Sequence, residues 1–309
     1  MEKPIIAFLD NLKIMEEHIT QLQHFGSVIQ SPSDWPKQDE VLQLVSNATI
    51  IVSKWVYISE TILANAPHLQ YVVMAMTGYQ DWVDMEAIKK RKLLVSNVPA
   101  FSTEAVAEHA LLLMLTVARR LPHASKQIQS GIFNPKEKSL QGFELKGKTL
   151  GIIGRGHIGS RIEELAKVCG MNVFSINSTS SKEEFHKLLR KSEIISVNTP
   201  LTPKTFHLLS EKELSLTQKG TVIINTSRGK VISEKALIKY LQNGHLAGAG
   251  LDVFEKEPLP AGNPLLKMSN VVATPHIAYN TRESYKRLCD GVVENIKAFI
   301  AEKPKNVVS

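Results

Sequence analysis

The amino-acid sequence predicts an α/β protein with two lobes, each built on a doubly wound parallel sheet. Its 309 residues, 43% hydrophobic and 22% charged, are enough for two globular domains of ordinary size. Short apolar runs alternate with amphipathic segments along most of the chain, which is typical of parallel strands covered by helices. A glycine-rich turn within Gly151–Gly159 joins a strand to a helix near the middle of the sequence.

The first third of the chain predicts one parallel sheet that ends at Val98-Pro99. Helical segments such as Met15–Gln23 and Asp39–Ser46 separate its strands. A long apolar helix, Thr103–Leu121, is expected next, with Ser102 as its N-cap and two arginines at its C-terminal end. The expected strands are Ile5–Leu9, Ser27–Gln30, Thr49–Val52, Leu69–Met74 and Leu93–Asn97.

After a polar stretch, Gln127–Lys146, a second α/β unit is expected. The final helix, Arg282–Ala301, has apolar residues one turn apart and is expected to return to the first sheet, since the second unit already has its strands. We therefore predict a domain of residues 1–98 and 282–309, interrupted by a domain of residues 99–281, with a cleft between them. The later strands are predicted at Asn172–Ile176, Ile194–Asn198, Val222–Asn225, Ala247–Val253 and Val271–Thr274.

The segment GIIGRGHIG predicts a dinucleotide-binding turn. Gly154 permits the tight turn, Gly156 lets the backbone approach a pyrophosphate, and Gly159 lets the helix pack on the strand. The amides and the positive dipole end of that helix suit phosphate groups. The spacing alone is a weak signal, but here a strand precedes it and an amphipathic helix follows, so an ordinary glycine turn is the less favoured interpretation.

Composition argues against several partners. The net charge of +7 is scattered, which favours a basic surface over a nucleic-acid site and would help to attract anions. The most apolar segment, Ala110–Ala118, is far too short to cross a membrane, and the N-terminus is expected to form a strand rather than an export signal. Cys169 and Cys289 are expected to be small core residues in a reducing compartment, the cytoplasm. We predict no metal site.

Three polar residues follow strands of the second unit, at the edge where open α/β sheets bind their ligands. They are Arg228, Glu257 and His276. Each alone could be a loop cap, a solvated turn residue or a structural histidine. Together they suit chemistry on a carboxylic acid, because a guanidinium binds a carboxylate through two hydrogen bonds and a carboxylate beside an imidazole favours its protonated form.

Several motifs together resemble the D-isomer-specific 2-hydroxyacid dehydrogenases. The similarity runs from about Thr49 to the C-terminus and is carried by GRGHIG, NTPLTPKT, INTSRGKVI, LDVFEKEP and TPHIAYNTRE. Within the family, SKW, SNVPAFSTEAVAEHALLLML and ENIKAFIAEKPKNVV look most similar to the glycerate dehydrogenase or hydroxypyruvate reductase branch. The resemblance implies a Rossmann nucleotide domain inserted in a discontinuous flavodoxin-like substrate domain.

The same resemblance implies residue roles. Arg228 would bind the carboxylate and carbonyl of the substrate, His276 would donate the proton in reduction, and Glu257 would tune His276. The substrate residues would include Lys54, although a surface lysine is an equal alternative, and a backbone loop at Met76, Thr77 and Gly78, where one extra residue before Asp81 leaves the inward-pointing amides undecided. The expected cofactor-binding residues are Gly154, Arg155, Gly156, His157, Ile158, Gly159, Asn177, Ser178, Thr199, Pro200, Thr205, Thr226, Ser227 and Asp252, the last of which could instead be a turn former.

The ribose position departs from the family pattern. Where an acidic residue usually binds the 2′-hydroxyl of NAD, this chain has Asn177, followed by Ser178, Thr179 and Ser180. Because no acid is there to repel a 2′-phosphate, we favour NADP(H). No arginine replaces the acid and the loop is short, so NAD(H) stays open. These hydroxyls could also simply cap the next helix.

The predicted function is hydride transfer between NAD(P)H and C2 of a small 2-oxo acid, giving a D-2-hydroxy acid. Two alternatives stay open: a dinucleotide-sensing scaffold similar to transcriptional corepressors, and 3-phosphoglycerate dehydrogenase. The chain ends soon after its final helix, without the partner tails of the first or the regulatory domain of the second. The apolar helix Thr103–Leu121 suggests a homodimer, although a helix in the core between domains would have the same composition.

Overall fold

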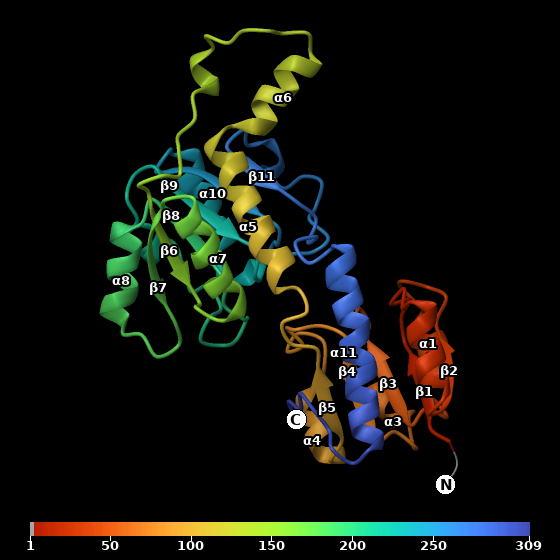
Figure 1. Ribbon diagram of the computed structural model, residues 1–309. Helices are drawn as coiled ribbons and strands as arrows, with labels where there is room; N and C mark the ends of the chain where they lie inside the picture. Colours follow the sequence, from red (N-terminus) through yellow and green to blue (C-terminus); the bar gives the residue numbers. More distant parts are fainter. Residues whose placement is uncertain (1–2) are drawn as a thin grey trace. The chain divides into compact units, whose positions relative to one another are not determined.

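The computed structural model describes residues 3–309, which form two compact units (Figure 1). Unit 1 comprises Met1–Ser102 and Thr281–Ser309, and unit 2 comprises Thr103–Asn280. The chain thus leaves the first unit and returns to it once. Both crossing points lie within a few residues of the boundaries expected from the sequence.

Unit 1 contains a five-stranded parallel sheet with the order β2-β1-β3-β4-β5, a flavodoxin-like order that reverses direction between β1 and β3. β3 and β4 are buried at every position, as expected of strands covered on both faces. The strands are β1 (Ile5–Phe8), β2 (Ser27–Gln30), β3 (Ile50–Ser53), β4 (Tyr71–Met74) and β5 (Leu94–Asn97). The helices are α1 (Glu16–Gln23), α2 (Gln38–Val45), α3 (Glu60–Ala64), α4 (Met85–Arg91) and α11 (Arg282–Ile300).

The last helix, α11, packs on the sheet of unit 1, as expected. The ring of Phe299 stacks on Tyr71 of β4 at 4.3 Å, and the buried Asn295 side chain donates to the carbonyl of Asn97 at 2.8 Å. Beyond the helix, the Val308 amide donates to Val95 at 2.9 Å, so the C-terminal residues lie against β5. These contacts join the two separate chain segments of unit 1.

Unit 2 contains a six-stranded parallel sheet, β11-β10-β9-β8-β6-β7, whose order reverses between β6 and β8. Helices α5 and α7 pack on one face of this sheet, and α8 and α10 pack on the other. The predicted α/β fold class is confirmed. The strands are β6 (Thr149–Ile153), β7 (Asn172–Ile176), β8 (Ile194–Val197), β9 (Thr221–Asn225), β10 (Leu246–Leu251) and β11 (Val271–Ala273). The helices are α5 (Thr103–Ala118), α6 (Leu121–Gln129), α7 (His157–Val168), α8 (Lys182–Lys191), α9 (Glu211–Leu214) and α10 (Glu234–Gln242).

The predicted helix Thr103–Leu121 is wrong at its C-terminal end. α5 stops at Ala118, Arg120 takes a left-handed conformation with φ 50°, and α6 starts at Leu121. Pro122 explains the break, because it has no N–H to donate to the carbonyl of Ala118. The Phe143 amide donates to that carbonyl instead, at 2.9 Å. Because α6 runs to Gln129, the first residues of the expected polar stretch Gln127–Lys146 are helical. None of the helices between residues 3 and 309 is long and apolar enough to span a bilayer.

Candidate active site

The carboxyl ends of β9, β10 and β11 carry the three residues for which we predicted catalytic chemistry. Arg228 lies three residues after β9, Glu257 lies in the loop after β10, and His276 follows β11. Because these strands are parallel neighbours, their carboxyl ends meet at one edge of the sheet. The structure therefore brings together residues that are up to 48 positions apart in the sequence, the difference between 228 and 276.

Glu257 and His276 form a hydrogen-bonded pair, with 2.8 Å between Oε2 and Nδ1, and each side chain is about one-third exposed. Burial raises the pKa of the Glu257 carboxyl, and the hydrogen bond and charge of His276 oppose that effect. The Phe254 amide, which donates to Oε1 at 2.9 Å, and the charge of Arg228 lower the pKa further, so it lies below its ordinary value. Glu257 is thus held as a carboxylate, which directs the Nε2 edge of the imidazole away from the pair.

The loop that carries His276 is held by the fully buried carboxylate of Asp252. Its Oδ1 accepts from the Ile277 amide at 2.9 Å and its Oδ2 accepts from the Ala278 amide at 2.8 Å. The His276 backbone has a left-handed φ of 54° and its amide donates to the Asp252 carbonyl at 2.8 Å. This geometry supports the turn-forming role of Asp252 that the sequence left open beside nicotinamide binding.

Two residues that the sequence did not identify extend this network. The Thr274 hydroxyl donates to Asp252 Oδ1 at 2.6 Å, and His109 Nε2 lies 3.0 Å from the same hydroxyl and 3.6 Å from that oxygen. His109 belongs to α5, where the sequence shows only a polar residue at the border of an apolar run. Its contact with Thr274, the residue after β11, depends on how α5 packs on the sheet, so no local sequence pattern could have predicted it.

Arg228 lies in a turn organised by Asn225, which the sequence also did not identify. The buried Asn225 side chain accepts from the Ser227 amide at 3.0 Å and donates to the Arg228 carbonyl at 3.0 Å. The next residue must be glycine, because a Cβ at Gly229 would lie 1.9 Å from the backbone of Phe254. The turn after β9 therefore packs directly on the loop that carries Glu257.

The glycine turn after β6 has the form that a dinucleotide requires. Gly154 has a positive φ of 99°, and a Cβ at Gly159 would lie 2.2 Å from the Gly154 carbonyl, so both positions need glycine. A Cβ added at Gly156, the N-cap of α7, would have no neighbouring atom within 4 Å. An open hollow lined by His157 and Ser160 of α7 and by Thr103 of α5 adjoins this position. The cradle thus fits a pyrophosphate at the helix N-terminus.

Buried oxygen atoms without partners lie beside this cradle. Among residues 3–309, Oδ1 of Asn198 and Oγ1 of Thr199, both just after β8, and Oγ1 of Thr226, just after β9, are buried without a hydrogen-bond partner. Such atoms usually have one, which suits a bound ligand here. By contrast, Thr205 Oγ1 donates to the Pro200 carbonyl at 2.6 Å, so its side chain closes the loop.

Asn177 directly follows β7, at the expected ribose position. Its Oδ1 accepts from the Thr179 amide at 2.9 Å and from the Thr179 hydroxyl at 2.7 Å. The Ser180 hydroxyl accepts from the Asn177 amide, and it is Ser181 that caps α8. The expectation that the hydroxyls of Ser178, Thr179 and Ser180 cap the helix is therefore wrong, because Ser181 is the cap, while Thr179 and Ser180 bond to Asn177 within the loop.

In unit 1, Lys54 follows β3, beside the point where the strand order reverses. It is 3% exposed, and its ammonium group donates to the Tyr285 hydroxyl at 2.9 Å and lies 4.3 Å from the centre of that ring. Burial lowers the pKa of Lys54 to about 8, and the negative charge of Asp10 partly opposes that shift. Lys54 is thus not the surface lysine that the sequence left possible.

The loop after β4 carries Met76, Thr77 and Gly78. The Met76 amide donates to the Met74 carbonyl at 2.7 Å, and the Thr77 hydroxyl donates to the Val98 carbonyl at 3.2 Å. Asn97 fixes the loop by donating to the Thr77 carbonyl at 2.8 Å. The Met76 amide is therefore engaged within the loop itself.

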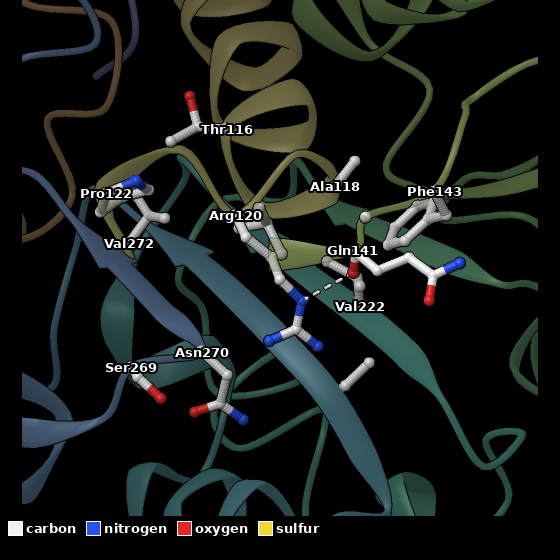
Figure 2. Close-up of a pocket in the computed structure, with 13 residues that line it drawn as sticks. Thr116, Ala118, Arg120, Pro122, Gln141, Phe143, Val222, Ser269, Asn270 and Val272 are labelled. Atoms are coloured by element: carbon white, nitrogen blue, oxygen red, sulfur yellow. Dashed lines mark hydrogen bonds between the residues drawn. The ribbon is translucent and has the colours of Figure 1, made fainter. Parts of the chain in front are cut away.

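A separate hollow in unit 2 lies at the opposite, amino-terminal edge of the sheet (Figure 2). Val222 and Ala247, near the starts of β9 and β10, line it together with Arg120, whose Nε donates to the Gln141 carbonyl at 3.1 Å. None of the site residues predicted from the sequence lines it. Among residues 3–309, no group of three or more His, Cys, Asp or Glu side chains could hold a metal ion.

Comparison with known proteins decides the family. Residues 111–278 match the model described as D-isomer specific 2-hydroxyacid dehydrogenase, NAD binding domain. The chain belongs to this family. It is 38% identical over 287 residues to the glyoxylate reductase of Thermococcus litoralis, covering 88% of this chain and 85% of that protein. It is 31% identical over 284 residues to the hydroxypyruvate reductase of Blautia hydrogenotrophica, covering 88% of each.

Among solved structures, the fold is similar to that of the acyclic imino acid reductase Bsp5 in complex with NADPH and D-Arg. The TM-score is 0.91 at 30% sequence identity, and the match covers 99% of this chain and 100% of that one. The resemblance to the D-2-hydroxyacid dehydrogenases that the motifs predicted is confirmed, and the protein is an oxidoreductase of that family with an NAD-binding domain.

Proposed function

We propose that this protein reduces glyoxylate or hydroxypyruvate, with His276 as proton donor and Arg228 as the group that binds the substrate carboxylate. The observation that carries the proposal is the Glu257–His276 hydrogen bond at the sheet edge that also holds Arg228. The names of relatives such as the Thermococcus litoralis enzyme support the choice of substrate.

The proposed chemistry follows from these side chains. A bound nicotinamide supplies the hydride that C2 of the 2-oxo acid accepts. The imidazolium of His276 donates its Nε2 proton to the oxygen that becomes negative at C2, while its Nδ1–H stays bonded to Glu257. Arg228 binds the planar carboxylate through two N–H groups and stabilises the same developing charge. The product is a D-2-hydroxy acid.

The remaining residues are proposed to bind cofactor or substrate. Gly154, Gly156 and Gly159 form the turn for the pyrophosphate, and the partnerless oxygens of Thr199 and Thr226 suit polar groups of a dinucleotide. For substrate binding we propose Lys54 and the backbone loop of Met76, Thr77 and Gly78. NADP(H) is our preferred cofactor because Asn177 leaves no acid at the ribose position.

A screen of 2-oxo acids against NADH and NADPH tests the proposal. We expect measurable kcat/KM for glyoxylate and hydroxypyruvate, and a higher kcat/KM with NADPH than with NADH. Turnover of neither acid would refute the substrate assignment, and a clear preference for NADH would refute the cofactor assignment.

Replacing Glu257 with glutamine should shift the pH dependence of the reaction. In the oxidation of the 2-hydroxy acid, His276 must be neutral to accept a proton, and a carboxylate at 2.8 Å favours its charged form. Glutamine removes that charge, so the acidic limb of kcat/KM should move away from its wild-type position. Since Glu257 is ionised throughout this range in the wild type, a superimposable profile would contradict the tuning role.

Lys54 should impose a second pH dependence. As the pH rises through about 8, the Lys54 ammonium loses its proton, so an anionic substrate loses one attractive charge. We expect KM for glyoxylate to rise above that pH, by roughly tenfold for a charge-assisted hydrogen bond. Lys54→Met should have the high KM at every pH, whereas Lys90→Met, on the exposed side of α4, should behave like the wild type. A KM independent of Lys54 would remove it from substrate binding.

We also propose a homodimer formed through α5, α6 and the loop that follows. α6 has no buried residue, and apolar side chains are exposed along this region. They are Leu112, Leu115, Leu121, Ile128, Ile132 and Phe133, exposed by between 42% and 83%. Light scattering should give the mass of a dimer for the wild type and of a monomer for Phe133→Asp. Val168→Asp, at an exposed apolar position on α7, should stay dimeric. A wild-type monomer at micromolar concentration would contradict this proposal.

A further inference from the structure

Arg155 lies where the glycine turn meets the end of β7. Its amide donates to the carbonyl of Ile176 at 3.0 Å, and Ile176 is the last residue of the strand. The following residue, Asn177, occupies the position at which the family usually has an acid for the ribose. An arginine is therefore present beside the ribose position, although it comes from the glycine turn and not from the strand.

The Arg155 guanidinium is held in place by Glu163 of α7. Nε donates to Glu163 Oε2 at 2.8 Å, and the Ser175 hydroxyl lies 3.4 Å from the same oxygen. Ser175 lies near the C-terminal end of β7, two residues before Asn177. The anchor thus holds the guanidinium beside the end of β7, and the Arg155 side chain is still 52% exposed.

The charges of this cluster do not cancel. Lys167 also binds Glu163, with 2.6 Å between Nζ and Oε1. Two cations therefore share one carboxylate, which leaves an excess positive charge. The remaining N–H groups of the Arg155 guanidinium are directed away from its bond to Glu163, and they match phosphate oxygens.

The loop after β7 offers donors and no carboxylate at the ribose position. Asn177 Oδ1 accepts two hydrogen bonds from Thr179, and the Asn177 side chain is exposed. The carboxylate of Glu184 accepts from the Ser181 amide in the capping box of α8. A phosphate group at the ribose would thus meet an arginine, an amide and hydroxyl groups.

We propose that Arg155 is the specificity-determining residue that binds the 2′-phosphate of NADPH, with Asn177 as its neutral neighbour. This inference rests on the proposed dinucleotide function and adds the residue that would select between the two cofactors. Glu163 pre-organises the guanidinium, so little side-chain freedom is lost on binding.

Nucleotide fragments test the proposal without any catalysis. Adenosine 2′,5′-bisphosphate carries the 2′-phosphate and AMP lacks it. By calorimetry, the wild type should bind the bisphosphate more tightly than AMP. Arg155→Ala should lower the affinity for the bisphosphate by roughly ten- to a hundredfold, the range for hydrogen bonds to a charged group. Its affinity for AMP should stay within about twofold of the wild type. Arg155→Lys, which keeps the charge without the fork, should lie between the two.

Arg190→Ala is the control for the loss of one positive charge. Arg190 is an exposed residue near the C-terminal end of α8, so its replacement changes the net charge by the same amount as Arg155→Ala. The control should keep the affinity for the bisphosphate. Equal losses in both variants, or an Arg155→Ala protein that still prefers the bisphosphate, would overturn the proposal.

Binding by the wild type separates this inference from the proposed function. Equal affinity for the two fragments would overturn the role of Arg155 and leave dinucleotide binding intact. Binding of neither fragment would overturn both. As a second readout, Arg155→Ala should lower the ratio of kcat/KM for NADPH over NADH by the same factor as the fragment affinity.

Discussion

Replacing His276 with alanine should lower kcat for glyoxylate reduction by roughly two to four orders of magnitude, the usual contribution of a positioned general acid. The imidazole is the group that Glu257 orients, and a methyl group cannot donate the proton that the alkoxide requires. Cofactor affinity should stay within a few-fold of the wild type, because His276 follows β11, away from the glycine turn after β6. Steady-state kinetics and calorimetry with the reduced cofactor measure the two effects separately.

His207→Ala is the control for this substitution. His207 lies 2.8 Å from Glu255, so unit 2 contains a second histidine–glutamate pair of the same length. It lies in the loop between β8 and α9 and has no proposed role in catalysis, so kcat should be near that of the wild type. If His276→Ala turned over at the wild-type rate, or if both variants lost activity equally, the assignment of His276 as proton donor would be wrong.

Replacing Arg228 with lysine should lower kcat/KM by roughly ten- to a hundredfold, the value of a lost charge-assisted hydrogen bond. Lysine keeps the charge and loses the planar fork that binds a carboxylate through two parallel bonds. Because Arg228 is proposed to bind both the ground-state carboxylate and the developing charge, KM should rise and kcat should fall together.

The turn that carries Arg228 leaves little room for rearrangement. Asn225 holds its backbone and Gly229 packs on the Phe254 backbone, so a shorter cation cannot move toward the substrate. Arg190→Lys, at an exposed position of α8, should leave both constants unchanged. Wild-type kinetics for Arg228→Lys would show that a point charge is sufficient and would refute two-point binding.

The fold was predictable because the strands are short apolar runs separated by helical periodicity, and each run at residues 5–97 and 149–273 lies within a few residues of an observed strand. The residues proposed for catalysis were predictable for a related reason. Parallel strands align their carboxyl ends, so polar residues after β9 and β11 had to meet at one edge of the sheet.

The supporting residues were not predictable, because their contacts join distant segments. Nothing near His109 in the sequence indicates Thr274, 165 positions away. The burial of Lys54 depends on Tyr285, which comes from the final helix, 231 positions later. The break after Ala118 had a local cause in Pro122, but the apolar periodicity and the arginines after Ala118 favoured a continuous helix.

Transfer of deuterium from a reduced nicotinamide labelled at C4 is the most direct test of the proposed reaction. With hydroxypyruvate as substrate, mass spectrometry and chiral chromatography should find the label at C2 of D-glycerate, at a rate that His276→Ala reduces by orders of magnitude. Formation of the L-enantiomer, or no transfer of the label from the cofactor to C2, would contradict the account.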